Sequence, residues 1–237
     1  MQNDKIQLTY LTNEREQCIL INREHCSPKR VDTMPRDKTE SHDRIVSAAK
    51  AEFMKYGFEN ASMRRIAANS GLTVSGLYKH FPGKEDMFAH LIQPMLDDFV
   101  ELYRQKEKEE HDAIEKMGAD AAFLNEDAVF TMEYIYDNFD EFKLLVCCSQ
   151  GTKFENYAHK FAEMEEESSL KYIQELKMLG YPVPAFDKNE FHLLVTSNVE
   201  AVLQPIRHDF TREAAMHYAK TINTFFSKGW KWFCGIE

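Results

Sequence analysis

The 237-residue chain lacks several features that mark whole classes of protein. Its five cysteines show neither the paired spacing of a zinc site nor the density of a disulfide scaffold, so we expect reduced thiols. No apolar run approaches the roughly 20 residues that cross a bilayer. The N-terminus has no basic segment followed by an apolar one, which argues against a signal peptide. These absences favour a cytoplasmic globular protein with no membrane partner, and a hydrophobic content of 43% permits a substantial core.

Signatures of enzymes and metal sites are also missing. The segment Cys147-Cys148-Ser149-Gln150-Gly151 lacks the first glycine of a nucleophile elbow and lies in a predicted helix with no preceding strand. Six residues separate Gly76 from Gly83, where a phosphate-binding P-loop has four. The chain has no Glu-x-x-His pair for a di-iron bundle, and His80 has no metal-ligating partner at usable spacing. We therefore predict no enzyme activity, no cofactor and no metal.

The stretch from Ser62 to Phe81 has the pattern of two short helices and a turn. We expect the Ser62 hydroxyl to cap the first helix, Gly71 to take the left-handed position at its end, and Thr73 to cap the second helix. The buried side of the second helix is predicted to consist of Leu77, Tyr78 and Phe81. Such a pair fits a DNA-binding helix-turn-helix, but from spacing alone it fits ordinary all-α packing equally well.

The identities of the amino acids in this stretch are more specific than their spacing. The string Ile-Ala-x-x-x-Gly-Leu-Thr-x-x-x-Leu-Tyr-x-His-Phe-x-x-Lys-Glu-x-x-Phe closely resembles the tetracycline-repressor (TetR) family of bacterial regulators over about residues 40 to 90. Two departures are Gly83, where the family usually has Ser, and Val74, where it often has Lys or Arg. The resemblance implies an all-α fold, with an N-terminal three-helix helix-turn-helix DNA-binding domain and a C-terminal helical ligand-binding and dimerisation domain.

The resemblance also implies that the second helix lies in the major groove of double-stranded DNA. Base contacts or close approach are expected from Thr73, Val74, Ser75, Gly76 and Lys79. Phosphate contacts are expected from Ser62, Arg64, Tyr78, His80 and Lys84. The glycine at 76 is open to a second interpretation, because any small residue is tolerated on a surface.

The formal charge of −10 is unevenly distributed. Between Arg36 and Lys84 nine basic residues face five acidic ones, which leaves this segment at +4. The rest of the chain is correspondingly acidic. We expect DNA to meet the basic segment only, since the acidic remainder repels phosphate.

Three regions follow in chain order. Residues 1–35 show no sustained apolar period and are expected to form a disordered extension, or to be untranslated if synthesis begins at Met34; a basic arm with Lys29 and Arg30 is the alternative. Residues 36–83 are the predicted DNA-binding domain, whose first helix runs from Ser41 to Tyr56. Its predicted core comprises Phe53, Phe58, Ile66, Ala67, Leu72, Leu77 and Phe81.

Residues 84–237 are predicted to be entirely helical. A long helix from Lys84 to about Glu110 contains Pro94, which is either a passive kink or a hinge. Further helices are expected up to Asn138, from about 142 to 150, from 154 to 179, from 187 to 207 and from 211 to 232. The acidic residues Glu163, Glu165, Glu166 and Glu167 are interpreted as one solvated face, and Cys147 and Cys148 as small buried hydrophobes.

Aromatic and methionine residues of this region suggest an apolar ligand cavity, although for any one of them ordinary core packing is the better explanation. These residues are Phe99, Tyr103, Tyr134, Phe142, Tyr157, Phe161 and Met164. By resemblance the last two helices pair with a second copy in a homodimer. The resulting hypothesis is a TetR-type regulator, a repressor released from an inverted-repeat operator by an unidentified small apolar inducer. The alternative is an all-α ligand- or partner-binding protein without specific DNA recognition.

Overall fold

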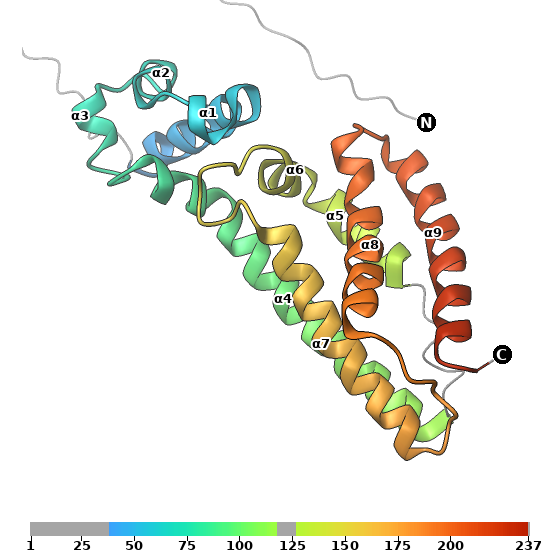
Figure 1. Cartoon of the computed structure of the whole chain (residues 1–237). Helices are drawn as coiled ribbons and strands as arrows, with labels where there is room; N and C mark the ends of the chain where they lie inside the picture. The colour runs from blue at the N-terminus through green and yellow to red at the C-terminus, as the bar shows by residue number, and fades with distance from the viewer. Residues whose placement is uncertain (1–37, 118–126, 237) are drawn as a thin grey trace, which may run out of the picture. The chain divides into compact units, whose positions relative to one another are not determined.

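The computed structural model describes residues 38–117 and 127–236, and within these ranges every regular element is a helix (Figure 1). The helices are α1 (Lys38–Asn60), α2 (Met63–Asn69), α3 (Val74–Leu77), α4 (Lys84–Met117), α5 (Asp127–Asp137), α6 (Phe139–Cys147), α7 (Tyr157–Met178), α8 (Lys188–Arg207) and α9 (Arg212–Phe233). The all-α prediction is confirmed. No helix in the described ranges is long and apolar enough to cross a membrane. The predicted extension 1–35 lies outside the described residues.

Helix α1 is longer than the sequence predicts, but the predicted break at Gly57 is present. The φ angle of Gly57 is +71°, in the left-handed region that favours glycine, and one further helical turn follows it. The backbone N–H of Phe58 leaves the helical pattern and donates to the Cys148 carbonyl at 2.9 Å. This bond ties the end of α1 to the loop after α6.

Helices α1 and α4 share a small aromatic core. The rings of Phe53, Phe58 and Phe88 lie in mutual contact, with centroid distances of 5.1 to 5.9 Å. The predicted core residues are buried, except that Leu72 is only partly buried. The prediction for Tyr78 is wrong: its side chain is 49% exposed at the end of the single-turn helix α3, whereas Leu77 and Phe81 are buried.

Helix α4 runs from the first three helices through the length of the body, and it continues without interruption through Pro94. The bend or hinge at this proline stays a prediction. One apolar cluster extends from Phe53 in α1 through Met95 in α4 and Phe142 in α6 to Ile206 in α8. Because this cluster is continuous across Lys84, the domain limits 36–83 and 84–237 also stay a prediction.

The body is built from α4 and the five helices that follow. Figure 1 shows α4 and α7 side by side, and hydrogen bonds from Tyr103 to Glu165 (2.9 Å) and between His111 and Glu175 (2.8 Å) join them. Helix α8 packs on α7, and α5 packs on α9. Local caps set the starts of the last two helices: Asp187 accepts from the Asn189 and Glu190 N–H groups, and Thr211 accepts from Ala214 N–H.

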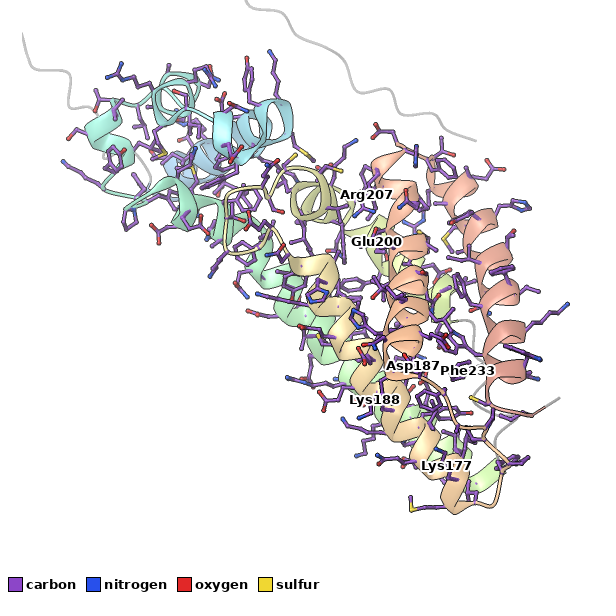
Figure 2. All side chains as sticks on the ribbon, in the orientation of Figure 1. Lys177, Asp187, Lys188, Glu200, Arg207 and Phe233 are labelled. Atoms are coloured by element: carbon purple, nitrogen blue, oxygen red, sulfur yellow. The ribbon has the colours of Figure 1, made fainter. Side chains whose placement is uncertain are left out.

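A second apolar cluster lies at the end of the body farthest from the first three helices. Figure 2 labels Lys177, Asp187 and Phe233 in this region. The ring of Phe186 lies 5.2 Å from that of Phe233, and the Lys177 ammonium lies 5.6 Å from the Phe186 ring. The cluster joins α7, α8 and α9, so it holds the two C-terminal helices against the rest of the body.

Candidate DNA-binding surface and ligand cavity

The turn between α2 and α3 has the predicted geometry. Gly71 has a φ of +73°, and the Thr73 hydroxyl oxygen accepts from the Gly76 N–H at 3.0 Å, which caps α3. A Cβ added at Gly76 would lie 3.2 Å from that hydroxyl oxygen, which is closer than an ordinary contact. The cap itself therefore favours glycine here, a reason that the sequence pattern does not reveal.

The Ser62 hydroxyl does not cap α2, contrary to the prediction. Ser62 occupies the N-cap position, but its side chain makes no capping bond. Its backbone N–H donates instead to Glu52 Oε1 at 2.9 Å, across ten residues of sequence. A carboxylate from α1 thus holds the start of α2 through the N–H of the N-cap residue, a different donor from the one that the serine hydroxyl was expected to bind.

Glu52 connects α1 to α2. Its side chain is only 2% exposed, and Oε1 also accepts from Arg65 Nε at 2.7 Å, while Arg65 Nη2 donates to the Asn60 carbonyl at 2.9 Å. Burial opposes ionisation of Glu52, but the bonds from Arg65 and Ser62 outweigh it, so the pKa of this carboxyl is lowered. The guanidinium lies 4.3 Å from the centre of the Tyr56 ring. These contacts hold the helix pair rigid relative to α1.

The predicted DNA-contacting residues are not all equally accessible. Six of the ten are exposed at or near α3: Arg64, Thr73, Ser75, Tyr78, Lys79 and His80. Val74 and Gly76 are partly buried, with Val74 packed against the core. No side chain in the described ranges pairs with Arg64 or Lys79, so these two cations can meet phosphate without breaking an internal bond.

Lys84 has internal partners. Its Nζ donates to the Glu59 carbonyl at 3.0 Å and to the Ala61 carbonyl at 3.4 Å, and it lies 4.4 Å from the centre of the Phe58 ring. The lysine therefore stabilises the end of α1 and the start of α2. Its predicted phosphate contact stays a prediction.

An ion-pair group joins α1 to α6. Lys50 Nζ lies 2.8 Å from Asp140 Oδ2 and 2.9 Å from Glu141 Oε1. Burial lowers the pKa of Lys50, but the two carboxylates outweigh it and the net direction is upward. Together with the Phe58–Cys148 backbone bond, these contacts couple the helix-turn-helix unit to α6.

The body contains a cavity of about 260 Å³ between α4, α5, α6, α7, α8 and α9. Five of the seven predicted ligand-binding residues line it: Phe99, Tyr103, Phe142, Phe161 and Met164. Tyr134 and Tyr157 do not. The Tyr134 hydroxyl donates to the Met95 carbonyl at 3.1 Å, and Tyr157 lines a separate small hollow near Arg207.

The sequence analysis missed the acidic groups of this cavity. Glu110, Asp127 and Glu165 line it, and the interpretation of residues 163–167 as one solvated face is wrong for Glu165. Burial and the neighbouring Asp127 and Glu107 charges raise the pKa of Glu165, although the Tyr103 hydroxyl bond opposes this. Glu166 is also engaged, since its Oε2 lies 2.7 Å from His192 Nδ1. The surroundings of these acidic side chains depend on how the helices pack, so the sequence alone does not predict them.

The cysteine interpretation is half correct. Cys148 is buried, as predicted, but Cys147 is exposed at the end of α6, which corrects its interpretation as a buried hydrophobe. The described His, Cys, Asp and Glu side chains include no group of three that could hold a metal ion.

A capped helix pair with an exposed polar face, braced on a helical body with an internal cavity, defines an all-α helix-turn-helix protein. The family described as "Bacterial regulatory proteins, tetR family" matches residues 45–91. Residues 45–91, which include α2, α3 and most of α1, are therefore similar to the TetR family of bacterial regulatory proteins. This family is one of regulators, in agreement with the prediction that the chain is not an enzyme.

Curated relatives match 91 residues of the chain. HTH-type transcriptional regulators from Staphylococcus aureus strains USA300 and NCTC 8325 / PS 47 are each 35% identical over 91 residues, which is 38% of this chain and 49% of theirs. The chain thus matches about half the length of these relatives. Among solved structures, NalD, the secondary repressor of the MexAB-OprM multidrug efflux pump in Pseudomonas aeruginosa, has a TM-score of 0.51 at 14% identity, over 79% of this chain and 96% of NalD. This likeness concerns the fold alone.

Proposed function

We propose that this protein is a TetR-type DNA-binding transcriptional regulator, a repressor that a small molecule releases from an inverted-repeat operator. The single observation that carries the proposal is the exposed face around α3. It is held by the Thr73 cap and the Glu52–Arg65 brace, and it presents hydroxyls, an imidazole and an unpaired lysine to solvent. These groups suit hydrogen bonds to base edges and phosphates.

A second copy of the chain is required for this mode of binding. One four-residue helix reads only a few base pairs, whereas a two-fold dimer places two such helices in successive major grooves, roughly 34 Å apart. Helices α8 and α9 supply a surface for it, because Leu193, Leu194, Phe225 and Trp232 on them are 44 to 74% exposed. Several large apolar side chains with such exposure on two adjacent helices suit an interaction site. We propose that α8 and α9 form the homodimer interface.

Release by ligand needs a physical connection from the cavity to the DNA-binding helices. The cavity is lined by Phe99 of α4 and Phe142 of α6, and both helices contact α1. A ligand that favours one position of these helices would change the separation of the two α3 helices in the dimer. DNA affinity then falls by the difference in ligand affinity between the two states.

The test is a titration of the full-length protein with DNA from upstream of its own coding sequence, over a range of salt concentrations. The proposal predicts sequence preference over random duplex and a steep loss of affinity with salt, because phosphate binding releases counterions. Binding that is equal for all sequences, or absent at low salt, would refute it. If a small molecule still bound the cavity in that case, the alternative function would hold: an all-α ligand-binding protein without DNA recognition.

A further inference from the structure

The cavity lining combines aromatic rings with carboxylates, and the described lining residues include no lysine or arginine. The aromatic members are Phe99, Tyr103, Phe142, Phe161, Tyr172, Phe191, Phe226 and Trp230. The acidic members are Glu110, Asp127 and Glu165. His111 is the one basic group among the described lining residues, and Glu175 already holds its Nδ1 at 2.8 Å. The cavity therefore has three acidic side chains and no lysine or arginine among its described lining residues.

Glu165 is the carboxylate with the least compensation. Its Oε2 accepts from the Tyr103 hydroxyl at 2.9 Å, and this is its one hydrogen bond within the described part of the chain. The charges that act on it from nearby, those of Asp127 and Glu107, are both negative. The positive charge of Lys171 is already paired, 3.4 Å from Glu107 Oε1 and 3.2 Å from Glu167 Oε1. A cation placed beside Glu165 would relieve this repulsion.

Glu110 and Asp127 form a second acidic group in the lining of the same cavity. Burial raises the pKa of Asp127, although its contact with Glu110 and the Lys106 charge oppose this rise. Lys106 partly offsets their charge, but its Nζ is engaged 3.4 Å from Glu109 Oε2 and 4.7 Å from the centre of the Phe130 ring. Glu165 is therefore the stronger anchor for a positive charge.

We propose that the cavity binds a small organic cation, with its ammonium group at Glu165 and its apolar body among the aromatic side chains. The proposal deepens the proposed function, since it rests on the cavity taking a small molecule. Aromatic faces attract cations as well as apolar groups. A cavity of about 260 Å³ lies below the roughly 300 to 1,000 Å³ of drug-sized pockets, so the ligand is small.

Other ligand classes fit less well. An anion would add a like charge to the carboxylates, and a neutral apolar molecule would remove their water without supplying a partner, which costs free energy. A bare metal ion does not fit either, because no three of the described His, Cys, Asp and Glu side chains come together in a metal-binding group.

Three probes with one phenylbutyl body separate the charge classes: 4-phenylbutylamine, 4-phenyl-1-butanol and 4-phenylbutyrate. Calorimetric titration of the full-length protein at pH 7 is expected to give an affinity for the amine about tenfold above that for the alcohol, with the acid weakest. In Glu165→Gln the advantage of the amine should fall to about threefold or less, while the alcohol is unaffected.

Glu163→Gln is the matched control, since Glu163 lies on the same helix, is 60% exposed and does not line the cavity. It should bind all three probes like the wild type. Glu165→Gln should unfold at or above the wild-type temperature, because glutamine keeps an acceptor for Tyr103 and removes a poorly solvated charge.

The inference is overturned if the alcohol or the acid binds as tightly as the amine, or if Glu165→Gln keeps the full preference for the amine. Those results would still allow the cavity to bind a small molecule, and they would refute only the preference for a cation. If none of the probes binds, the inference also fails, whereas the DNA titration above still decides the proposed DNA-binding function separately.

Discussion

Replacing Glu52 tests how the DNA-binding helices are held together. In Glu52→Ala the Ser62 N–H and the Arg65 guanidinium both lose a buried acceptor, at distances of 2.9 and 2.7 Å. Because Arg65 is half-exposed and can be hydrated, we expect a loss of about 2 to 3 kcal/mol of unfolding free energy, or roughly 4 to 12 °C in melting temperature. Glu52→Gln keeps an acceptor and should lose less than half as much.

Urea unfolding followed by circular dichroism measures the effect, with Glu40→Gln as the control. Glu40 lies on the same helix and is exposed, so its replacement should change stability by about 0.5 kcal/mol or less. The pKa of Glu52 is lowered in the folded state from its ordinary value of 4.5. Its contribution is therefore complete well above pH 4.5 and is lost as the pH falls through the lowered pKa. A Glu52→Ala protein as stable as the wild type at pH 7, or a difference that grows in acid, would refute this reasoning.

Three further predictions follow from the exposed groups. Lys79→Ala should weaken DNA binding roughly fivefold and reduce the salt slope by about 2 for a dimer, whereas Lys160→Ala on α7 should change neither; an unchanged slope contradicts the phosphate contact. Phe225→Asp should convert dimers to monomers in sedimentation, with Met178→Asp as a control that stays dimeric. At pH 8 Ellman's reagent should modify Cys147 before Cys234, whose pKa burial raises to about 11, and the reverse order contradicts the buried position of Cys234.

Features set by neighbouring residues were predictable from the sequence. The Thr73 cap, the left-handed Gly71 and the caps at Asp187 and Thr211 depend on hydrogen bonds within three residues, and helix periodicity placed α8 and α9 to within one or two residues. The TetR resemblance covers the helix-turn-helix segment, and the family match over residues 45–91 confirms that resemblance.

Features set by tertiary packing were not predictable. Ser62 stands at the N-cap position, but its hydroxyl makes no capping bond, and a carboxylate ten residues earlier accepts from its backbone N–H. Glu165 lies among acidic neighbours that suggest a solvated face, and only the approach of Tyr103 from α4 turns it inward. Tyr78 was expected in the core, because a single turn of helix gives no second turn that would show which way its side chain points. The cavity's acidic character therefore emerges only from the folded chain.

The most direct test of the central claim is selection of random duplex DNA by the purified full-length protein, followed by sequencing of the retained fragments. The account predicts an enriched inverted repeat with half-site centres about one helical turn, roughly 10 base pairs, or a multiple of it, apart. Retained fragments without a shared repeat, recovered from a protein that is folded, would contradict it.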